Sequence, residues 1–451
     1  MSTYQHRIRQ YWRQLRHCRT LYAPAAELLA AEEDPDVMRS VDLLVLSPAM
    51  NAYVIWLLRR AADSGIRRLY FLARDGYLVY ETAQKYCRQL NLPIECRYLY
   101  CSRYSLRAAI YHQDIDEALS YICRGGMGIT PRKLMLRSGF SAQRSEEILS
   151  QLDLSYEPNT PIPFAHLPQV RETLKNSQIY TSALTEISLQ AFPAVKGYFS
   201  QEGLLEDCPM AIVDSGWTGS MQKSIQQIRQ LCGCQNPICG FYYGIYYLPH
   251  GATASEYHAF SFYRWRHLGR KVFFNNNLFE TVYCSPHGST QGYKQEDDAY
   301  VPVLTEADPR IRDYILTLEQ HMASYTDVLL KHTTRQQFAE ISISRLQRTV
   351  SGLFRLLMWS PVLQEAELFG RMPFSDDLLD DGRQELAAPL SAEQLRSNHL
   401  FPKLLSMTNL RPKPMHESAW YEASTVRFGT HPHLDRLSYT LYRILLYLKP
   451  R

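Results

Sequence analysis

The sequence predicts an α/β protein built on a parallel sheet, and two observations support this prediction. First, an apolar run over residues 67–74 lies between helix-like patterns, and an aromatic and β-branched run follows at residues 94–103. Helix, strand, helix and strand in short succession are typical of a parallel sheet. Second, the strand, turn and helix pattern returns at residues 208–228, and further strands are expected at residues 238–248 and 256–265.

The two strand-rich segments define the expected domain organisation. Residues 41–110 and 205–295 are expected to form one α/β core. Residues 111–204 contain helix-like segments without a strong strand run, so they predict a helical insertion into that core. Residues 296–451 predict a mainly helical carboxy-terminal region.

Residues 1–40 predict one or two helices, and residues 50–62 predict an amphipathic or buried helix that Gly65 terminates. Five arginines between residues 7 and 19 alternate with aromatic and aliphatic residues. A basic amphipathic helix of this kind either lies on an anionic membrane surface or packs one face on the protein body. The pattern favours packing and leaves a peripheral membrane contact as the alternative.

Composition excludes several classes of protein. The net charge is only +4, and no basic and aromatic stripe continues beyond the amino terminus, so nucleic-acid binding is not expected. No uncharged apolar stretch reaches the roughly 18 residues of a membrane span, and the arginine-rich start does not resemble a signal peptide. The ten cysteines are scattered through a long chain, which favours reduced thiols and a cytoplasmic location.

Two strand-to-helix turns have the composition of phosphate-binding sites. In an open parallel sheet, ligands bind where strands end and helices begin, and helix amino termini present free N–H groups to anions. The first turn contains Arg74, Asp75 and Gly76. A further predicted strand ends in Ser102 and Arg103, which places a hydroxyl and a guanidinium near the same edge.

The second turn runs from Asp214 to Ser220. Gly216 and Gly219 allow the backbone to fold tightly, and hydroxyls of this turn can join its N–H groups in a cup for a phosphate monoester. Asp214 can accept hydrogen bonds from sugar hydroxyls or hold a metal. The alternative is an ordinary strand, turn and helix with a Ser or Thr cap.

The first turn also resembles part of a phosphatase motif. A phosphatase of the haloacid dehalogenase type needs Asp-x-Asp-Gly after an apolar strand, with the first aspartate as nucleophile. Here the second aspartate is Asp75, but Ala73 stands at the nucleophile position. Because alanine cannot form an aspartyl-phosphate, no phosphatase activity is expected. Asp42 lacks the Asp-x-Asp pattern and is no substitute.

Three segments together resemble a known family. GIRRLYFLARDGY (residues 65–77), YLYCSRYSLR (98–107) and IVDSGWTGSMQ (212–222) resemble the phosphoribosyltransferase-like domain of bacterial polysaccharide biosynthesis, often fused to a haloacid dehalogenase-like phosphatase. The resemblance covers roughly residues 41–295. It implies a phosphoribosyltransferase-like core and a ribofuranosyltransferase that uses 5-phosphoribosyl 1-pyrophosphate (PRPP) to modify O-antigens or capsules. Ser215 stands where the family usually has a second acidic residue.

The resemblance implies a role for each candidate residue. The expected donor-binding residues are Arg74, Gly76, Ser102, Arg103, Ser215, Gly216, Trp217, Thr218, Gly219 and Ser220. Asp75 and Asp214 are expected to hold Mg²⁺, and the expected catalytic residues are Asp75, Asp214 and Glu280. The segment NNNLFETVYCSPHGSTQGY (residues 275–293) supplies the acceptor-binding candidates Asn277, Glu280 and His287.

Structural roles remain open for some of these residues: Glu280 as a solvated helix residue, His287 as a structural histidine and Arg103 in a surface ion pair. The general base is expected to be Asp75 or Glu280, with His287 third. The expected partners are PRPP, a lipid-linked or oligosaccharide acceptor and a separate phosphatase. Two alternatives to this enzyme are a non-catalytic, haloacid dehalogenase-like scaffold module for glycan assembly and a phosphotransferase acting on another sugar phosphate.

Overall fold

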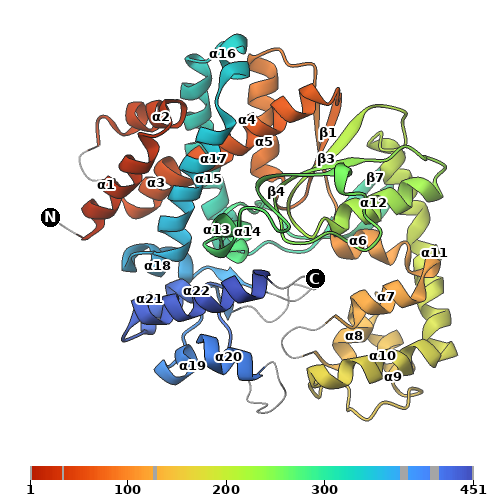
Figure 1. Cartoon of the computed structure of the whole chain (residues 1–451). Coiled ribbons are helices and arrows are strands. Elements are labelled where there is room, and N and C mark those ends of the chain that lie inside the picture. Colours follow the sequence, from red (N-terminus) through yellow and green to blue (C-terminus); the bar gives the residue numbers. More distant parts are fainter. Residues whose placement is uncertain (1–2, 33–34, 125–128, 376–383, 407–415, 449–451) are drawn as a thin grey trace.

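The computed structural model describes residues 3–32, 35–124, 129–375, 384–406 and 416–448 (Figure 1). Its centre is a sheet of five parallel strands in the order β2-β1-β3-β4-β5. The strands are β1 Arg68–Leu72, β2 Glu95–Leu99, β3 Met210–Trp217, β4 Cys239–Ile245 and β5 Tyr257–Tyr263. The predicted α/β class is therefore confirmed, and all five strands fall within residues 41–110 and 205–295.

Helices cover both faces of the sheet, so the strands are buried on two sides, as in other parallel sheets. All five residues of β1 are buried: Leu69 and Phe71 pack into one apolar cluster, and Tyr70 and Leu72 into another. The helices of the first side are α4 Ser47–Asp63, α5 Tyr77–Gln89, α15 Pro309–Lys331 and α17 Ile343–Phe354. Those of the second side are α6 Arg103–Ala108, α11 Gln178–Gln201 and α12 Ser220–Leu231.

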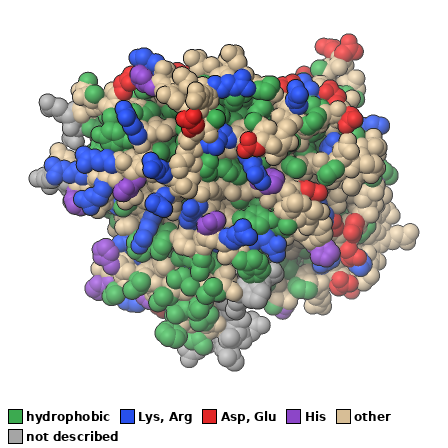
Figure 2. Space-filling model, turned by 45° about the horizontal axis from the view of Figure 1, so that its top comes forward, with side chains coloured by type: hydrophobic (Ala, Val, Ile, Leu, Met, Phe, Trp, Pro, Cys, Tyr) green, Lys and Arg blue, Asp and Glu red, His purple; other side chains and the backbone are tan. Residues whose placement is uncertain are grey.

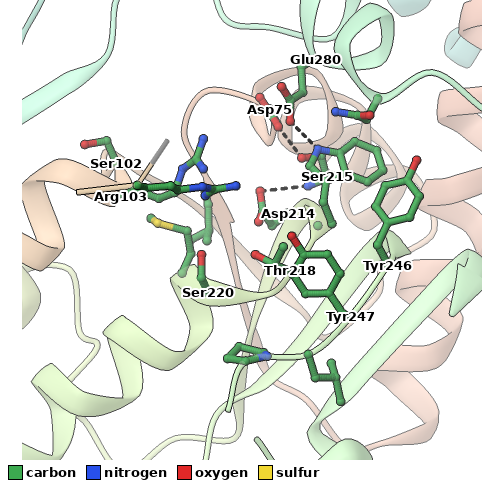
Figure 3. A pocket seen from close by; sticks show the side chains of 18 of the residues that line it. Asp75, Ser102, Arg103, Asp214, Ser215, Thr218, Ser220, Tyr246, Tyr247 and Glu280 are labelled. Carbon is green, nitrogen blue, oxygen red and sulfur yellow. Dashed lines mark hydrogen bonds between the residues drawn. The ribbon is translucent and has the colours of Figure 1, made fainter. Parts of the chain in front are cut away.

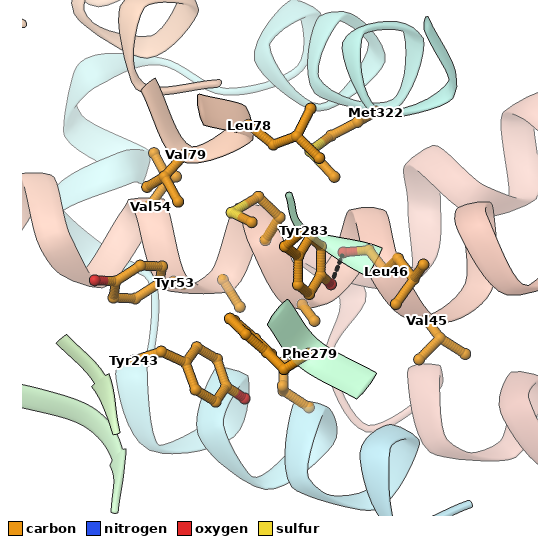
Figure 4. Close-up of a cluster of buried hydrophobic side chains, with 14 of the residues drawn as sticks. Val45, Leu46, Tyr53, Val54, Leu78, Val79, Tyr243, Phe279, Tyr283 and Met322 are labelled. Carbon is orange, nitrogen blue, oxygen red and sulfur yellow. Dashed lines mark hydrogen bonds between the residues drawn. The ribbon is translucent and has the colours of Figure 1, made fainter. Parts of the chain in front are cut away.

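The first apolar cluster is the main core of the protein (Figure 4). Tyr53 of α4, Tyr243 of β4 and Phe279 meet there, and the Tyr283 hydroxyl donates to the Leu46 carbonyl at 2.8 Å. Within the described residues, one helical run, Val37–Asp63, has the length and apolar composition of a membrane span, although its longest uncharged stretch, residues 43–58, stays below the roughly 18 residues considered above. Its apolar window is 94% buried inside the protein, as a core helix would be. Gly65 follows α4 with a φ of 69°, which is the predicted glycine stop.

The amino-terminal segment is helical and packs on the body. Its elements are α1 Thr3–Leu15, α2 Arg19–Leu29, α3 Val37–Val41 and the π-helical turn η1 Asp42–Leu46. Tyr11 and Leu15 of α1 are buried, and the guanidinium of Arg7 lies 3.5 Å from Glu365. The apolar face of α1 is therefore covered by the protein itself, and the exposed residues of the helix are Gln5, His6, Arg9 and Arg13.

The connection between β2 and β3 carries a separate apolar cluster. Besides α6 and α11, its helices are α7 Ile115–Ile122, α8 Pro131–Arg137, α9 Ala142–Leu149 and α10 Leu167–Asn176, with short turns η2 Tyr111–Gln113 and η3 Phe164–His166. Leu119, Leu134, Leu174 and Leu184 pack together in that cluster. Figure 1 shows α7 to α10 as a lobe below the sheet, with α11 running back toward it.

Beyond β5 the chain is mostly helical, with two hairpins that the sequence pattern did not predict. Strands β6 Thr290–Glu296 and β7 Ala299–Leu304 pair antiparallel around a turn in which Asp297 has a φ of 50°, and a shorter pair is formed by β8 Pro373–Phe374 and β9 Gln384–Glu385. The remaining elements are η4 Ala254–Glu256, α13 Leu268–Val272, α14 Asn276–Val282, α16 Arg335–Glu340, η5 Arg355–Trp359, α18 Leu363–Gly370, α19 Ala392–Ser397, α20 Leu400–Ser406, α21 Tyr421–Phe428 and α22 Pro432–Leu448.

Candidate active site

A cavity of about 690 Å³ opens at the carboxyl ends of the parallel strands. Residues that follow β1, β2 and β4 line it, together with the end of β3 and residues of α14 and α22. Strand β1 lies between β2 and β3. The chain therefore passes from β1 to its neighbour on one edge, β2, and then crosses back to its neighbour on the other edge, β3. This is a topological switch point, where open α/β sheets bind their ligands.

Ser215 connects the two strand ends at the centre of the cavity. Its hydroxyl donates a hydrogen bond to Asp75, which follows β1, and its backbone N–H donates to Asp214 Oδ1 at 2.9 Å (Figure 3). Asp75 and Asp214 are each half-buried in the cavity wall. The sheet register thus brings together two carboxylates that are far apart in the sequence, as predicted from the strand-end positions.

Glu280 of α14 adds a third carboxylate. It accepts a hydrogen bond from the indole Nε1 of Trp217, the last residue of β3. Figure 3 shows the Asp75 and Glu280 carboxylates next to each other, so Glu280 faces the cavity and is not a solvated helix residue. Trp217, which was predicted to bind the donor, lines the cavity, and its indole N–H is directed to Glu280.

Burial raises the pKa of all three carboxylates, and the charge of Asp75 contributes to the shifts of Asp214 and Glu280. Burial is the largest cause that raises the pKa of Asp214 to about 8, and the charge of Asp75 adds to it. Burial and Asp75 likewise raise the pKa of Glu280 to about 7. The pKa of Asp75 is also raised by burial, against the Ser215 hydrogen bond and the charges of Arg74 and Arg103. The raised values favour a site in which a cation or a proton joins the carboxylates.

Cationic side chains outnumber the carboxylates in the cavity wall. Among the described lining residues, three are acidic and six are Arg or Lys: Arg74, Arg103, Arg124, Arg137, Arg264 and Lys271. The charge of Arg103 lowers the pKa of Asp75, Asp214 and Glu280 alike, so it acts at the centre of the site and not in a surface ion pair. An excess of guanidinium groups suits a ligand with several phosphate charges.

The second predicted turn is shorter than the sequence suggested. Strand β3 continues to Trp217, because Gly216 pairs with Gly244 and Trp217 pairs with Ile245. Gly216 is required there, since a Cβ would lie 2.3 Å from the Gly244 carbonyl oxygen. Of the residues predicted to form the phosphate cup, only Thr218, Gly219 and Ser220 lie beyond the strand, and Gly219 does not line the cavity. Ser215 and Gly216 belong to β3 and line the cavity from there.

The remaining part of the cup lies at the start of α12. Gly219 precedes this helix in the left-handed conformation, and no side chain caps the helix. The first N–H groups of a helix lack intrahelical partners, and Ser220 and Met221 line the cavity here. Thr218 and Ser220 point their hydroxyls into the same space (Figure 3). This end of the cavity has the features of an anion site.

Two predicted donor-binding residues have structural roles. The Ser102 hydroxyl accepts from the Ser105 N–H at 3.0 Å as the cap of α6 and donates to the Thr290 carbonyl at 2.6 Å. Gly76 does not line the cavity. It lies where α5 begins against β1, and a Cβ there would be 2.5 Å from the Leu72 carbonyl oxygen. Arg103 is the first residue of α6, and the predicted strand of residues 94–103 ends earlier, at Leu99.

The acceptor candidates separate into two groups. Asn277 lines the cavity beside Glu280 and donates its amide to the Ala419 carbonyl at 3.1 Å. His287 lies outside the cavity lining, where its Nε2 is 2.8 Å from the Tyr98 hydroxyl and its Nδ1 is 2.8 Å from the Gly288 carbonyl. Both ring nitrogens of His287 are thus engaged, and the structure gives it the structural role that the sequence left open.

Several cavity residues were not predicted. Tyr246 and Tyr247 follow β4, so the rule that ligands bind beyond strand ends would have found them. Trp265 follows β5 and is 54% exposed at the cavity. Lys271 and Tyr447 had no such signal: Tyr447 comes from α22, and the Lys271 Nζ lies 4.5 Å from the centre of its ring.

The carboxylate oxygens of the cavity fit a magnesium ion that a phosphorylated ligand helps to bind. Within the part of the chain that the structure describes, no group of three or more His, Cys, Asp or Glu side chains is placed to hold a metal ion. Mg²⁺ commonly uses only one or two carboxylates together with substrate phosphates and waters. Asp75 and Asp214 offer such a pair, and each keeps a second oxygen beyond the one that Ser215 contacts.

Comparison of the chain with protein-family models and with curated proteins gave no match. The fold and the cavity define the class of protein: it is an α/β protein with a site of carboxylates and arginines at the switch point of a parallel sheet.

Proposed function

We propose that the protein is a phosphoribosyltransferase-type glycosyltransferase, which transfers 5-phosphoribosyl from PRPP to a sugar hydroxyl of a bacterial glycan and releases pyrophosphate. The observation that carries this proposal is the combination, in one cavity at the switch point, of three carboxylates with an excess of arginines. A donor with a phosphate, a pyrophosphate and a ribose diol needs both kinds of group. The phosphoribosyltransferase-like identity of the core is part of the proposal.

The cavity offers separate positions for the two ends of the donor. The ribose 5-phosphate would bind at Thr218, Gly219 and Ser220, where the uncapped start of α12 favours an anion. Asp214 would accept hydrogen bonds from the ribose hydroxyls. Arg74 and Arg103 would face the pyrophosphate. Asp75 and Asp214 would hold Mg²⁺, which supplies charge stabilisation for the pyrophosphate when bound.

In the transfer step, the bond from ribose C1 to the pyrophosphate oxygen breaks, and the pyrophosphate leaves with the electron pair. A new bond forms between C1 and the acceptor oxygen, and the acceptor proton passes to a general base. Positive charge develops on the ribose as negative charge grows on the leaving group. Arg74 and Arg103 stabilise the latter, which is the larger catalytic contribution expected at such a site.

Glu280 is the best-placed general base. Its pKa of about 7 lies near the working pH, which is the condition for efficient proton transfer. Trp217 holds one of its oxygens, so the carboxylate has a fixed orientation, and Asn277 lies beside it on α14. Asp75 is less suited to this role, because Ser215 already donates to it and two arginines act on it.

The partners follow from the resemblance and from the chemistry. The acceptor would be a lipid-linked or oligosaccharide precursor of O-antigen or capsule, and a separate phosphatase would remove the 5-phosphate. Because PRPP is the donor, the reaction would occur in the cytoplasm, in line with the expectation from the cysteines. A peripheral membrane contact through α1 would depend on its exposed arginines alone, since its apolar face is buried.

Calorimetric titration with PRPP, with and without Mg²⁺, tests the donor assignment. We expect micromolar binding that needs Mg²⁺ and weakens in Asp214→Asn. Pyrophosphate release in the presence of glycan acceptors then tests transfer. Binding without any pyrophosphate release would favour the non-catalytic scaffold module, and absence of binding at every Mg²⁺ concentration would rule out PRPP as the donor.

A further inference from the structure

Helix α22 is oriented with its polar side inward and its apolar side outward. The three charged residues of the helix, Asp435, Arg436 and Arg443, are all buried. Five leucines of the same helix are between 44% and 63% exposed: Leu434, Leu437, Leu441, Leu445 and Leu448. Their spacing of three, four, four and three residues places them on one side of a helix. An ordinary surface helix buries its apolar side and exposes its charged side, so the orientation of α22 is the reverse.

Buried polar contacts fix this orientation. Arg443 pairs with Glu422 at 3.1 Å, and Asp435 lies 2.8 Å from the ring of His399. Thr440 accepts a hydrogen bond from the Trp359 indole at 2.8 Å. Rotating the helix to hide its leucines would break these contacts and leave buried charges unpaired, which is costly. The apolar face of α22 is therefore a built feature, and large exposed apolar surfaces of this kind mark interaction sites.

Exposed basic side chains lie on or next to two elements against which α22 packs. Exposed Arg355 stacks on Trp359, whose indole contacts α22 through Thr440. Exposed Arg266 and His267 precede α13, and the carbonyl of Lys271 in α13 accepts from Arg443 at 3.3 Å. Figure 2 shows apolar side chains gathered in the lower part of the view, with Lys and Arg side chains above them and acidic side chains mainly toward the right.

Two exposed aromatic residues and two exposed acidic residues lie on neighbouring segments of the chain. Phe401 of α20, which contacts α22, is 75% exposed and extends the apolar surface. Trp265, beside Arg266, is 54% exposed, and aromatic residues of this kind concentrate at the boundary between lipid and water. The two exposed acidic residues are Glu393 in α19 and Glu417, which precedes α21. The charge of Glu417 is paired with Lys403 at 2.9 Å.

We propose that the exposed leucine face of α22 docks on a membrane surface that contains anionic lipids. Leucines inserted at the headgroup boundary and arginines beside them are the two features that bind interfacial helices to such a surface. A second copy of the chain fits less well, because a two-fold contact across this face would bring the neighbouring arginines of both copies together. The basic side chains therefore favour an anionic lipid surface as the binding partner of this face.

Docking there would bring the cavity to the membrane. Leu446 and Tyr447 of α22 line the cavity, so the helix that would contact lipid on one side forms the active-site wall on the other. If the proposed function is correct, this arrangement favours an acceptor that is anchored in the membrane by a lipid. The docking itself does not depend on PRPP chemistry, so it can be tested without the donor.

The test is co-sedimentation of the full chain with vesicles of phosphatidylethanolamine and phosphatidylglycerol, and with vesicles of phosphatidylcholine alone. We expect binding to the anionic vesicles that falls at least about tenfold in Leu437→Glu with Leu441→Glu. Arg355→Gln and Arg266→Gln should each weaken it about fivefold, and only for anionic vesicles. The matched control is Leu189→Glu in α11, since Leu189 and Leu437 are both 54% exposed.

Two results would overturn the proposal. The first is no binding to anionic vesicles, or binding that the leucine variants leave unchanged although they fold normally by thermal melting. The second is a concentration-dependent dimer in sedimentation velocity that the same variants abolish, without vesicle binding, which would assign the face to a second copy. Neither result bears on PRPP binding, so failure of this proposal and failure of the proposed function are distinguishable.

Discussion

The Ser215 hydroxyl donates a hydrogen bond to Asp75 across the boundary between β1 and β3. The N–H of the same serine holds Asp214 at 2.9 Å, so one residue fixes two carboxylates whose charges repel. The resemblance of the sequence to phosphoribosyltransferases implies that Ser215 takes the place of an acidic residue. The structure supplies a reason for a serine here: a third carboxylate between Asp75 and Asp214 would increase the repulsion, whereas a hydroxyl donor reduces it.

Asp214→Asn should weaken PRPP binding and abolish transfer while leaving the fold intact. Asparagine keeps the size of the side chain but loses the charge that would accept from ribose hydroxyls and contact the metal. A lost hydrogen bond to a charged group corresponds to about ten- to a hundredfold in affinity. Calorimetry measures the binding, and normal activity in the variant would remove Asp214 from the donor site.

Removal of Asp214 should also change the pH dependence of stability in the unliganded protein. Its pKa is raised in the folded state from 3.8 to about 8, so between these values the folded protein holds more protons than the unfolded chain. The free energy of unfolding contributed by this group therefore falls as the pH rises from about 4 to about 8. We expect Asp214→Asn to melt at a higher temperature than the natural protein at pH 8, with a smaller difference at pH 5.

The control for this stability prediction is Asp63→Asn, because Asp63 is an exposed aspartate at the end of α4. The same series of melting curves should show no comparable divergence between this variant and the natural protein. If the difference in melting temperature between the Asp214 variant and the natural protein does not grow from pH 5 to pH 8, the pKa of Asp214 is not raised in the folded state.

Much of the fold and part of the site could be predicted because the signals are local. The strands are short apolar runs buried on both faces. Asp75 stands just beyond the end of β1, and Asp214 lies in the carboxy-terminal half of β3. One rule, that parallel strands end at a common edge, was enough to place these aspartates together. Gly65 ended α4 for an equally local reason, its left-handed backbone.

The rest depended on contacts between distant parts of the chain. Trp217 and Glu280 are 63 residues apart, and nothing in either segment indicates their hydrogen bond. The Ser102 hydroxyl was available in the sequence but is taken by the α6 cap and by Thr290. Hairpin β6–β7 was missed because both strands are largely exposed or half-buried, β6 carries polar residues, and the apolar run of β7 is interrupted by Pro302.

The natural protein should show no phosphatase activity on ribose 5-phosphate or on a chromogenic phosphate ester. Ala73 lines the cavity at the position where a haloacid dehalogenase-type enzyme has its nucleophile, and a methyl group cannot accept a phosphoryl group. Release of inorganic phosphate, measured with and without Mg²⁺, is the test. Turnover that disappears in Asp75→Asn would show that the cavity does hydrolytic chemistry and would contradict this prediction.

Glu280→Gln should slow transfer by about 10²- to 10⁴-fold, the usual contribution of a general base. Since the pKa of Glu280 is about 7, kcat/KM of the natural enzyme should rise with pH through about 7, as the carboxyl loses its proton. In Glu280→Gln that rise should be absent, while PRPP affinity changes little. A rise that persists in the variant would move the base role to another group.

Arg103→Met separates electrostatic tuning from donor binding at the same site. The charge of Arg103 lowers the pKa of Glu280, so removing it should shift the rise in kcat/KM to higher pH. The same variant should bind PRPP more weakly, because a guanidinium that faces the pyrophosphate is lost. Arg88→Met in α5 is a control, since Arg88 is exposed and does not line the cavity. An unchanged pH profile with weaker PRPP binding would limit Arg103 to the donor site, whereas an unchanged affinity with a shifted profile would place the pyrophosphate elsewhere, next to Arg74 or Arg264.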